Sequence, residues 1–147
     1  MDIGPLEYVV IGVTDQQLKS DLISELNAIQ EAGKIRVVDL IFISKAADGA
    51  VKMQEVSELV EEELAEYGDI AINLMGLLTA EDIKQLTGQI PTDSSAVVIL
   101  IEHTWVIGLT EAVRTNGGAV YAAGMVSHDI LAQVSAELAA GKEGKNA

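Results

Sequence analysis

The chain has 147 residues, of which 49% are hydrophobic and only 3% aromatic, so it is long enough for one folded domain with an aliphatic core. Its formal net charge of −14 disfavours binding to nucleic acids and anionic membranes, and would attract cations or a basic protein partner. The absence of cysteine excludes disulfides, thiol catalysis, iron–sulfur clusters and cysteine-ligated zinc.

The N-terminal sequence carries no basic segment before its apolar run, and Gly4, Pro5 and Glu7 interrupt that run. This pattern differs from that of a secretory signal peptide. No stretch approaches the roughly 18 consecutive apolar residues that a membrane-spanning helix needs. We therefore expect a soluble, cytoplasmic protein without membrane insertion.

The first part of the chain predicts a strand, a helix and a β-hairpin. Residues 6–13 are short, apolar and rich in β-branched side chains, as buried strands are. In the helix that follows, Asp15 is the expected N-cap and Gly33 the left-handed stop. Residues 35–45 and 50–56 predict two strands joined by a tight Asp-Gly turn. The apolar face of the helix comprises Leu18, Leu22, Leu26 and Ile29.

The middle of the chain, residues 57–90, predicts a helical insertion. Its last short helix begins at a capping box formed by Thr79 and Asp82. A run of glutamates surrounds the start of the insertion, and Glu58 and Glu62 lie one helical turn apart, close enough to bind a divalent cation together. Because no Glu-x-x-His motif accompanies them, we expect a solvated helix face instead. The run comprises Glu55, Glu58, Glu61, Glu62, Glu63 and Glu66.

The last part of the chain predicts two further strands and two helices. Residues 96–102 are apolar up to Glu102, as in a strand covered on both faces. A helix containing Trp105 follows and ends at an Asn-Gly-Gly sequence. Residues 119–126 predict the last strand, and Ser127 is the expected cap of the last helix.

The predicted order of elements is β-α-β-β-(αα)-β-α-β-α, in which two βαβ-like units flank a hairpin. Crossovers in such units are right-handed and place their helices on one face of the sheet. We therefore predict an α+β fold, a ferredoxin-like α/β sandwich with a helical insertion at about residues 57–90. Residues 1–141 form a single domain in this interpretation, and residues 142–147 form a frayed polar tail.

The "EHTW" stretch at the end of a predicted strand contains the candidate ligand-binding residues Glu102, His103 and Trp105. Ligands tend to bind at strand ends in α/β sheets, and a carboxylate beside an imidazole can tune a general base. Adjacent strand residues point to opposite faces, however, so Glu102 and His103 can act on one atom only if the strand bends. We favour a structural role, in which Glu102 or Thr104 caps the next helix and Trp105 anchors it by burying its ring.

Other combinations of reactive side chains have less support. His103 and His128 are separated by a predicted helix and strand, and neither has a partner at the spacing of a zinc site. Ser127, His128 and Asp129 are consecutive and therefore cannot form a catalytic triad. The glycines do not form a phosphate-binding loop or a dinucleotide-binding motif. We expect no catalytic residue, no metal and no cofactor.

Four segments, "MDIGPLEYVVIG", "IRVVDLIFISKAADG", "GLLTAEDI" and "EHTWVIGLTEAVRTNGG", occur in this order along nearly the whole chain. Together they resemble a bacterial family of small acidic α/β proteins of unknown function. The resemblance implies no activity, substrate or catalytic residue. It does make "EHTW" the most recognisable motif of the chain.

Three functions are open at this point. The leading hypothesis is a non-enzymatic, self-associating structural or accessory protein, a homo-oligomer or filament subunit, because a sheet with helices on one side needs a cover that a second copy can supply. In a self-contained monomer, the insertion with its apolar residues 70–78 covers the sheet edge or face instead. The alternative is a small-molecule or metal-binding sensor domain with its site near Glu102, His103 and Trp105. The third is a hydrolase or isomerase with His103 as base and Glu102 as its orienting group.

Overall fold

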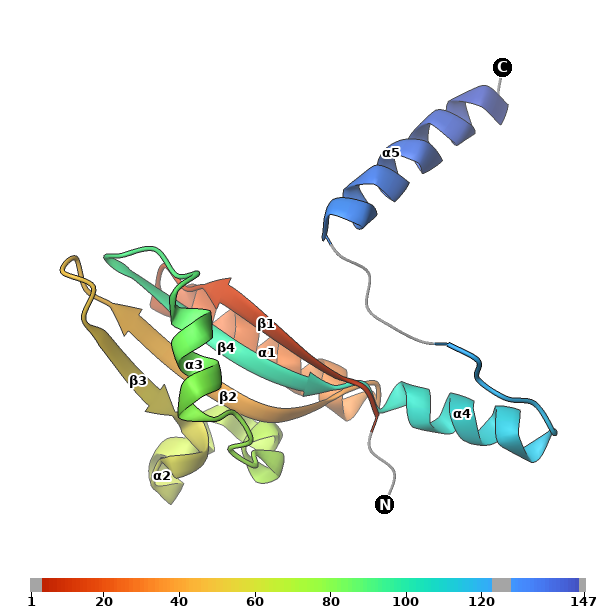
Figure 1. Ribbon diagram of the computed structural model, residues 1–147. Coiled ribbons are helices and arrows are strands. Elements are labelled where there is room, and N and C mark those ends of the chain that lie inside the picture. The colour runs from red at the N-terminus through yellow and green to blue at the C-terminus, as the bar shows by residue number, and fades with distance from the viewer. Residues whose placement is uncertain (1–3, 123–127, 146–147) are drawn as a thin grey trace. The chain divides into compact units, whose positions relative to one another are not determined.

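The computed structural model describes residues 4–122 and 128–145 (Figure 1). The strands are β1 (Leu6–Gly12), β2 (Arg36–Lys45), β3 (Val51–Glu55) and β4 (Ser94–Glu102). The α-helices are α1 (Gln16–Glu31), α2 (Glu61–Leu64), α3 (Ala80–Thr87), α4 (Trp105–Thr115) and α5 (His128–Lys145), and the 3₁₀ helices η1 (Val56–Glu58) and η2 (Ala65–Asn73) flank α2. The chain forms two compact units, one up to Ala112 and one from Val113 onward.

The four strands form one antiparallel sheet in the order β1-β4-β2-β3. This confirms the predicted α+β class, but the ferredoxin-like topology is not confirmed. In a ferredoxin-like sheet, the second strand of the hairpin lies between the two strands that the first helix connects. Here β4 occupies that place, between β1 and β2, and β3 lies at the outer edge (Figure 1). Residues 119–122, the described part of the predicted last strand, are not a strand, and residues 123–127 lie outside the described residues.

The local signals of the first half are confirmed. The Asp15 carboxylate accepts a hydrogen bond of 2.8 Å from the backbone N–H of Leu18 and so caps α1. Gly33 follows the helix with φ of 77°, a left-handed conformation that glycine adopts without strain. In the hairpin turn, Gly49 has φ of 89° and the Asp48 side chain accepts the N–H of Ala50. These contacts place β2 and β3 where the sequence predicts them.

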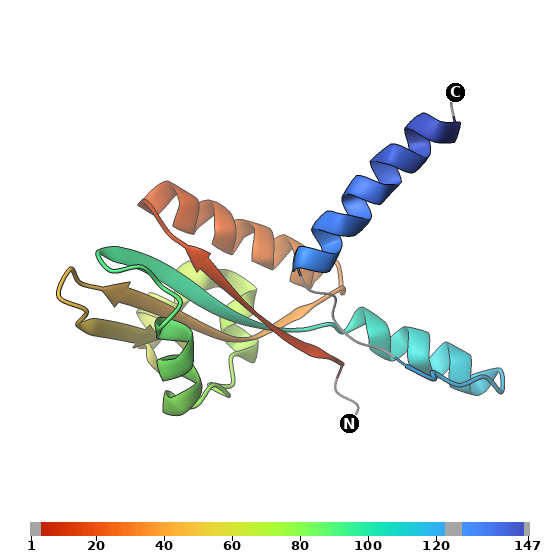
Figure 2. The same ribbon diagram turned by 45° about the horizontal axis from the view of Figure 1, so that its top comes forward.

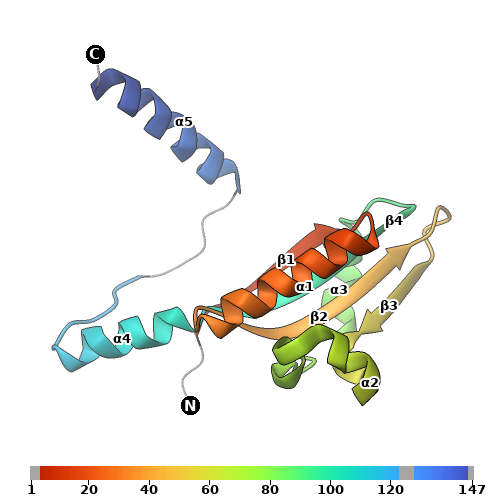
Figure 3. The ribbon, with the colours of Figure 1, turned by 180° about the vertical axis from the view of Figure 1, so that it is seen from behind.

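Helix α1 covers one face of the sheet, which we call the α1 face (Figure 3). The η2 segment extends this cover, and the Asn27 side chain joins the two: its amide donates to the carbonyl of Tyr67 and its oxygen accepts from the N–H of Ile70. The buried apolar residues on this face are Leu26, Val37, Leu40, Val56, Tyr67, Ile70, Val97 and Ile99.

Helix α3 packs on the opposite face, the α3 face, so that the sheet lies between α1 and α3 (Figure 2). This second cover comes from the predicted helical insertion and not from a crossover helix. The capping box of α3 is confirmed, since Thr79 and Asp82 exchange hydrogen bonds of 3.1 Å. The buried apolar residues on this face are Ile41, Ile43, Ile83, Leu86, Ile90, Ala96 and Val98.

Residues 74–79 carry the chain from η2, on the α1 face, to α3, on the opposite face. They pass the edge of β2 at the part of that strand that β3 does not cover. β3 pairs only with the second half of β2, from Ile41 to Lys45. Beyond this point β2 has a register irregularity near Val38, whose carbonyl accepts the N–H of Met75 at 2.8 Å. The short β3 thus leaves part of the edge of β2 free, and residues 74–79 use this edge to reach α3.

The second unit contains the last residues of α4 and all of α5. Gly117, with φ of 78°, ends α4 in the predicted Asn-Gly-Gly sequence. Helix α5 continues to Lys145, so the tail predicted to fray from residue 142 is helical up to that residue. Among the described residues, none of the helices combines the length and apolar character needed to cross a membrane.

Candidate functional site

Glu102, the last residue of β4, is held in a structural arrangement. Its side chain is only 3% exposed, and its Oε1 lies 2.8 Å from Nε of Arg36 on β2. The contact is an ion pair, because the Nε–H does not meet hydrogen-bond geometry. Its Oε2 accepts the backbone N–H of Gly4 at 2.8 Å. Glu102 therefore links the segment before β1 to the adjoining ends of β4 and β2.

His103 belongs to a different cluster, with Glu7 of β1 and Trp105 of α4. Its Nε2 lies 2.9 Å from Oε1 of Glu7, and its Nδ1 accepts a long hydrogen bond of 3.4 Å from the indole N–H of Trp105. Since an indole nitrogen only donates, Nδ1 is unprotonated in this arrangement and Nε2 carries the proton that points at Glu7. The result is a directed chain from indole to imidazole to carboxylate, with the imidazole 22% exposed.

The structure thus separates the predicted site residues. Glu102 and His103 lie on opposite faces, as strand alternation indicates, while His103 and Trp105 are brought together. The hydroxyl of Thr104 donates to the carbonyl of Gly33, at the end of α1. The expectation that Trp105 buries its ring is wrong, because this residue is 53% exposed. The ligand-binding role of the three residues stays a prediction.

Glu7 is a member of this cluster that the sequence pattern does not reveal. It is the one charged residue in β1, and it pairs with Ile101 in the register of β1 and β4. That register brings Glu7 to the same face of the sheet as His103. Only the order of the strands, which puts β4 beside β1, gives this partner to the histidine.

The outer edge of β1 is unpaired among the described residues. At the two ends of the strand, Pro5 accepts the N–H of His103 and Val13 donates to Ser95, so the odd-numbered residues face β4. Because hydrogen-bonded and non-hydrogen-bonded positions alternate along an antiparallel pair, the even-numbered residues direct their N–H and C=O groups outward. These residues are Leu6, Tyr8, Val10 and Gly12.

This edge lacks the features that usually prevent strands from pairing between molecules. Natural edge strands often carry lysine, proline or a bulge, but β1 contains none of these between its first and last residue. Its one charged side chain, Glu7, is engaged by His103. Leu6 and Tyr8 are 47% and 56% exposed. The edge is therefore open in both its backbone and its side chains.

A pair of carboxyl groups, from buried Asp39 and half-buried Glu55, lies on the α3 face. Asp39 is fully buried, and its two oxygens accept the N–H groups of Leu40 and Leu78 at 2.9 Å each. Burial raises the pKa of Glu55 from 4.5 to about 7, with further contributions from a hydrogen bond to Asp39 and from its charge, while the Ser57 hydroxyl lowers it. Glu55 therefore holds its proton to a higher pH than a solvated glutamate does.

The prediction that the whole acidic run is solvated is wrong for Glu55 alone. This residue ends β3 opposite Ile41, and Asp39 lies two residues before Ile41 on the same face. The other glutamates of the run are exposed, as predicted. Among the described residues, no group of three or more histidine or acidic side chains could bind a metal ion.

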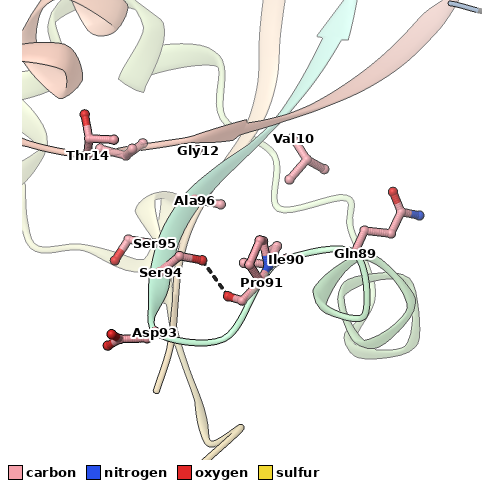
Figure 4. Close-up of a pocket in the computed structure, with 11 residues that line it drawn as sticks. Val10, Gly12, Thr14, Gln89, Ile90, Pro91, Asp93, Ser94, Ser95 and Ala96 are labelled. Carbon is pink, nitrogen blue, oxygen red and sulfur yellow. Dashed lines mark hydrogen bonds between the residues drawn. The ribbon is translucent and has the colours of Figure 1, made fainter. Parts of the chain in front are cut away.

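A hollow of about 570 Å³ lies on the α3 face, at the far end of the sheet from Glu102 (Figure 4). Val10, Ile90 and Ala96 form its apolar part, and Gln89 lies at one end. Asp93 lies at the other end with φ of 56°, a left-handed conformation that aspartate tolerates better than most residues. Within the lining of the hollow, the Ser94 hydroxyl donates a hydrogen bond to the carbonyl of Pro91.

Comparison with known proteins identifies a family but no activity. A family model described as a family of unknown function, DUF6325, matches residues 2–142. In the comparisons with curated proteins and with solved structures, no protein matches the chain. The match extends from the segment before β1 into α5, and includes every strand and the His103 cluster. The chain therefore belongs to the DUF6325 family of proteins of unknown function.

Proposed function

We propose that this protein is a non-enzymatic, self-associating structural or accessory subunit, and that two copies join along β1. The observation that carries the proposal is the open outer edge of this strand, with exposed Leu6 and Tyr8 beside unpaired backbone groups. A second copy of the same edge supplies complementary donors and acceptors, so the contact is isologous and closes as a dimer.

The position of the outward groups defines one favourable register. In an antiparallel pair of identical strands, outward residues must face outward residues. A twofold axis at Val9, the middle of the seven-residue strand, meets this condition because it places Tyr8 opposite Val10 of the partner subunit. An aromatic side chain across from a β-branched one contributes about 0.2–1 kcal/mol per pair relative to alanine. The joined sheets then form one continuous eight-stranded sheet, twice the four strands of one copy.

Charge opposes this association and makes it depend on salt. Each copy carries a formal net charge of −14, and the repulsion between two such molecules is screened over about 8 Å at physiological ionic strength. Raising the salt concentration therefore strengthens the dimer, the reverse of what an interface held by opposite charges does. This salt dependence separates pairing along β1 from binding of a basic partner.

The test is light scattering across a concentration series with edge variants. Tyr8→Pro removes an outward N–H but leaves the inward bonds of β1 to β4, so it should reduce the dimer to monomer while the helical and sheet signal in circular dichroism stays. Tyr8→Val keeps the N–H and is the matched control, which should still associate. Val10→Lys places a charge at the edge and is a second disrupting variant.

Two outcomes contradict the proposal. One is a wild-type monomer at every concentration and salt level. The other is a wild-type oligomer that both Tyr8→Pro and Val10→Lys leave intact, which would assign assembly to another surface.

A ligand-binding role at the His103 cluster is the second candidate, and the exposed indole of Trp105 beside the His103–Glu7 pair favours it. Glu102 is not part of this candidate site, because its two carboxylate oxygens already contact Arg36 and the N–H of Gly4. Trp105 is the only tryptophan, so its fluorescence reports directly on the site. Titration with Zn²⁺ should change this emission in the wild type and not in His103→Gln; an identical response in both proteins rules the site out.

A further inference from the structure

A second hollow, of about 320 Å³, lies on the α1 face between the first turn of α1 and the β2–β3 hairpin. Its lining includes the lysines Lys19 and Lys52 and the serines Ser44 and Ser95. We propose that this hollow binds a phosphate-type oxyanion. The proposal is independent of the pairing along β1, since none of the hollow's residues belongs to that strand.

The two lysines supply positive charge that no carboxylate neutralises. Among the described residues, the carboxylates in salt-bridge contacts are Glu102, beside Arg36, and Glu7, beside His103, so neither Lys19 nor Lys52 has an acidic partner. The ammonium group of Lys19 instead lies 4.5 Å from the centre of the Phe42 ring, which holds it at the hollow. In a chain with 23 acidic and 9 basic residues, two such lysines beside one hollow form a local positive region.

The sheet register places the hydroxyl groups next to this charge. Ser44 of β2 lies directly opposite Lys52 of β3 on one side and Ser95 of β4 on the other. The two serine oxygens are 3.1 Å apart and share one hydrogen bond. One hydroxyl donates to the other, so the second hydroxyl keeps a proton that it can donate to a ligand. Gln54, two residues after Lys52 on the same face, adds an amide to the lining.

These donors suit a tetrahedral oxyanion better than a carboxylate. Lys19 comes from the helix layer, whereas Lys52 and the serines come from the sheet below it. An ion whose oxygens point in four directions can meet both layers, and a second negative charge strengthens each ammonium contact. The adjoining hollow shares Ser44, Lys52 and Ser95 but also contains Asp93, whose carboxylate opposes an anion, so we place the ion on the Lys19 side.

The neighbouring Lys45 is not part of the site. Its ammonium group donates to the carbonyls of Thr87 and Ile90 at 3.1 Å each, and so ties the end of α3 to β2. Lys45 therefore has a structural role, because its ammonium group is occupied by two backbone carbonyls. Lys19 and Lys52 have no such backbone acceptors among the described contacts.

Titration of ¹⁵N-labelled protein with inorganic phosphate at constant ionic strength tests the proposal. The backbone amides of Ser44, Gln54 and Ser95 should shift and saturate, and acetate at the same ionic strength should leave them unchanged. Lys19→Met and Lys52→Met should each weaken phosphate binding at least about tenfold, the equivalent of one charge-assisted hydrogen bond. Lys84→Met, an exposed lysine on α3, is the matched control and should bind as the wild type does.

The proposal is overturned if phosphate produces no saturating shift, if acetate shifts the same amides equally, or if both Lys→Met variants bind phosphate as the wild type does. Lys52→Met keeps the test valid should Lys19→Met disturb the Phe42 contact, because Lys52 is exposed on β3 and has no ring partner among the described contacts.

Discussion

Glu102 and His103 are neighbours in the chain, but their side chains serve opposite faces of the sheet. Glu102 contacts Arg36 and Gly4 on one face, and His103 contacts Glu7 on the other. The "EHTW" motif therefore contains two separate arrangements. One is the ion pair of buried Glu102 with Arg36, and the other is a partly exposed imidazole between Glu7 and Trp105. Substitutions at Glu102 and at His103 should therefore differ in their effect on stability.

We expect Glu102→Ala to destabilise the protein and His103→Gln to do so much less. Removal of the buried carboxylate leaves the Gly4 N–H without an acceptor and Arg36 without its counter-ion. The free energy of unfolding should fall by about 1–3 kcal/mol, the usual result of leaving a buried group unsatisfied. Urea unfolding followed by circular dichroism measures both variants, and equal losses would refute the structural role of Glu102.

Gly4→Ala should destabilise the protein because no space exists for a methyl group. A Cβ atom at this position would overlap the backbone oxygen of His103, and this oxygen cannot rotate away. We expect a loss of about 1–3 kcal/mol in the free energy of unfolding, as for other overpacked sites. Gly12→Ala is the control, since nothing lies within 4 Å of the place that its methyl group would take. A comparable loss in both variants would contradict the argument.

Stability should decrease as the pH rises from about 4.5 to about 7. The raised pKa of Glu55 means that the native state holds a proton which the unfolded state has already released in this range. The native state therefore binds more protons, and the free energy of unfolding declines with pH until Glu55 is ionised. Above this range, Glu55 is ionised in both states and contributes no further slope.

Glu55→Gln should remove this part of the pH dependence, because the amide cannot ionise. The measurement is the urea midpoint of wild type and variant between about pH 4.5 and 8, with Glu58→Gln as a control at an exposed glutamate. Parallel curves for wild type and Glu55→Gln would show that Glu55 does not titrate in this range.

Asn27→Ala should loosen the η2 segment without unfolding the sheet. The Asn27 side chain donates to the carbonyls of Ile23 and Tyr67 and accepts from Ile70, so its removal leaves backbone groups of η2 without partners. Hydrogen exchange at the Ile70 amide should become faster, while the amides of β4 stay protected. Ser24→Ala, on the exposed face of α1, should leave the exchange at Ile70 unchanged.

Local features of the fold could be predicted because their signals lie within a few residues. The Asp15 cap, the Asp-Gly turn and the Thr79 capping box all depend on short spacings, and all three form. The order of the strands could not be predicted in this way. It depends on β4 inserting between β1 and β2, a choice that the pattern of apolar residues allows but does not impose.

The candidate sites follow the same rule. His103 and Trp105 can be recognised in the sequence because they are close together, whereas Glu7 cannot, because its contact with His103 spans 96 residues. Asp39 does leave a signal: an acidic residue inside an apolar strand must find hydrogen-bond donors when it is buried. Its partner Glu55 leaves no such signal, because in the sequence it looks like the exposed glutamates that follow it.

The strand order has a consequence for how the protein is made. β4 forms the pairs that join β1 to the hairpin of β2 and β3, yet it is the last of these strands to leave the ribosome. Until residue 102 has emerged, the edges of β1 and β2 that pair with β4 have no partner. The apolar cores on both faces also lack the residues that β4 contributes to them. Folding must therefore wait for a strand that begins, at Ser94, far along the chain from β1, which is the kind of long-range pairing that slows folding and prolongs exposure to chaperones and proteases.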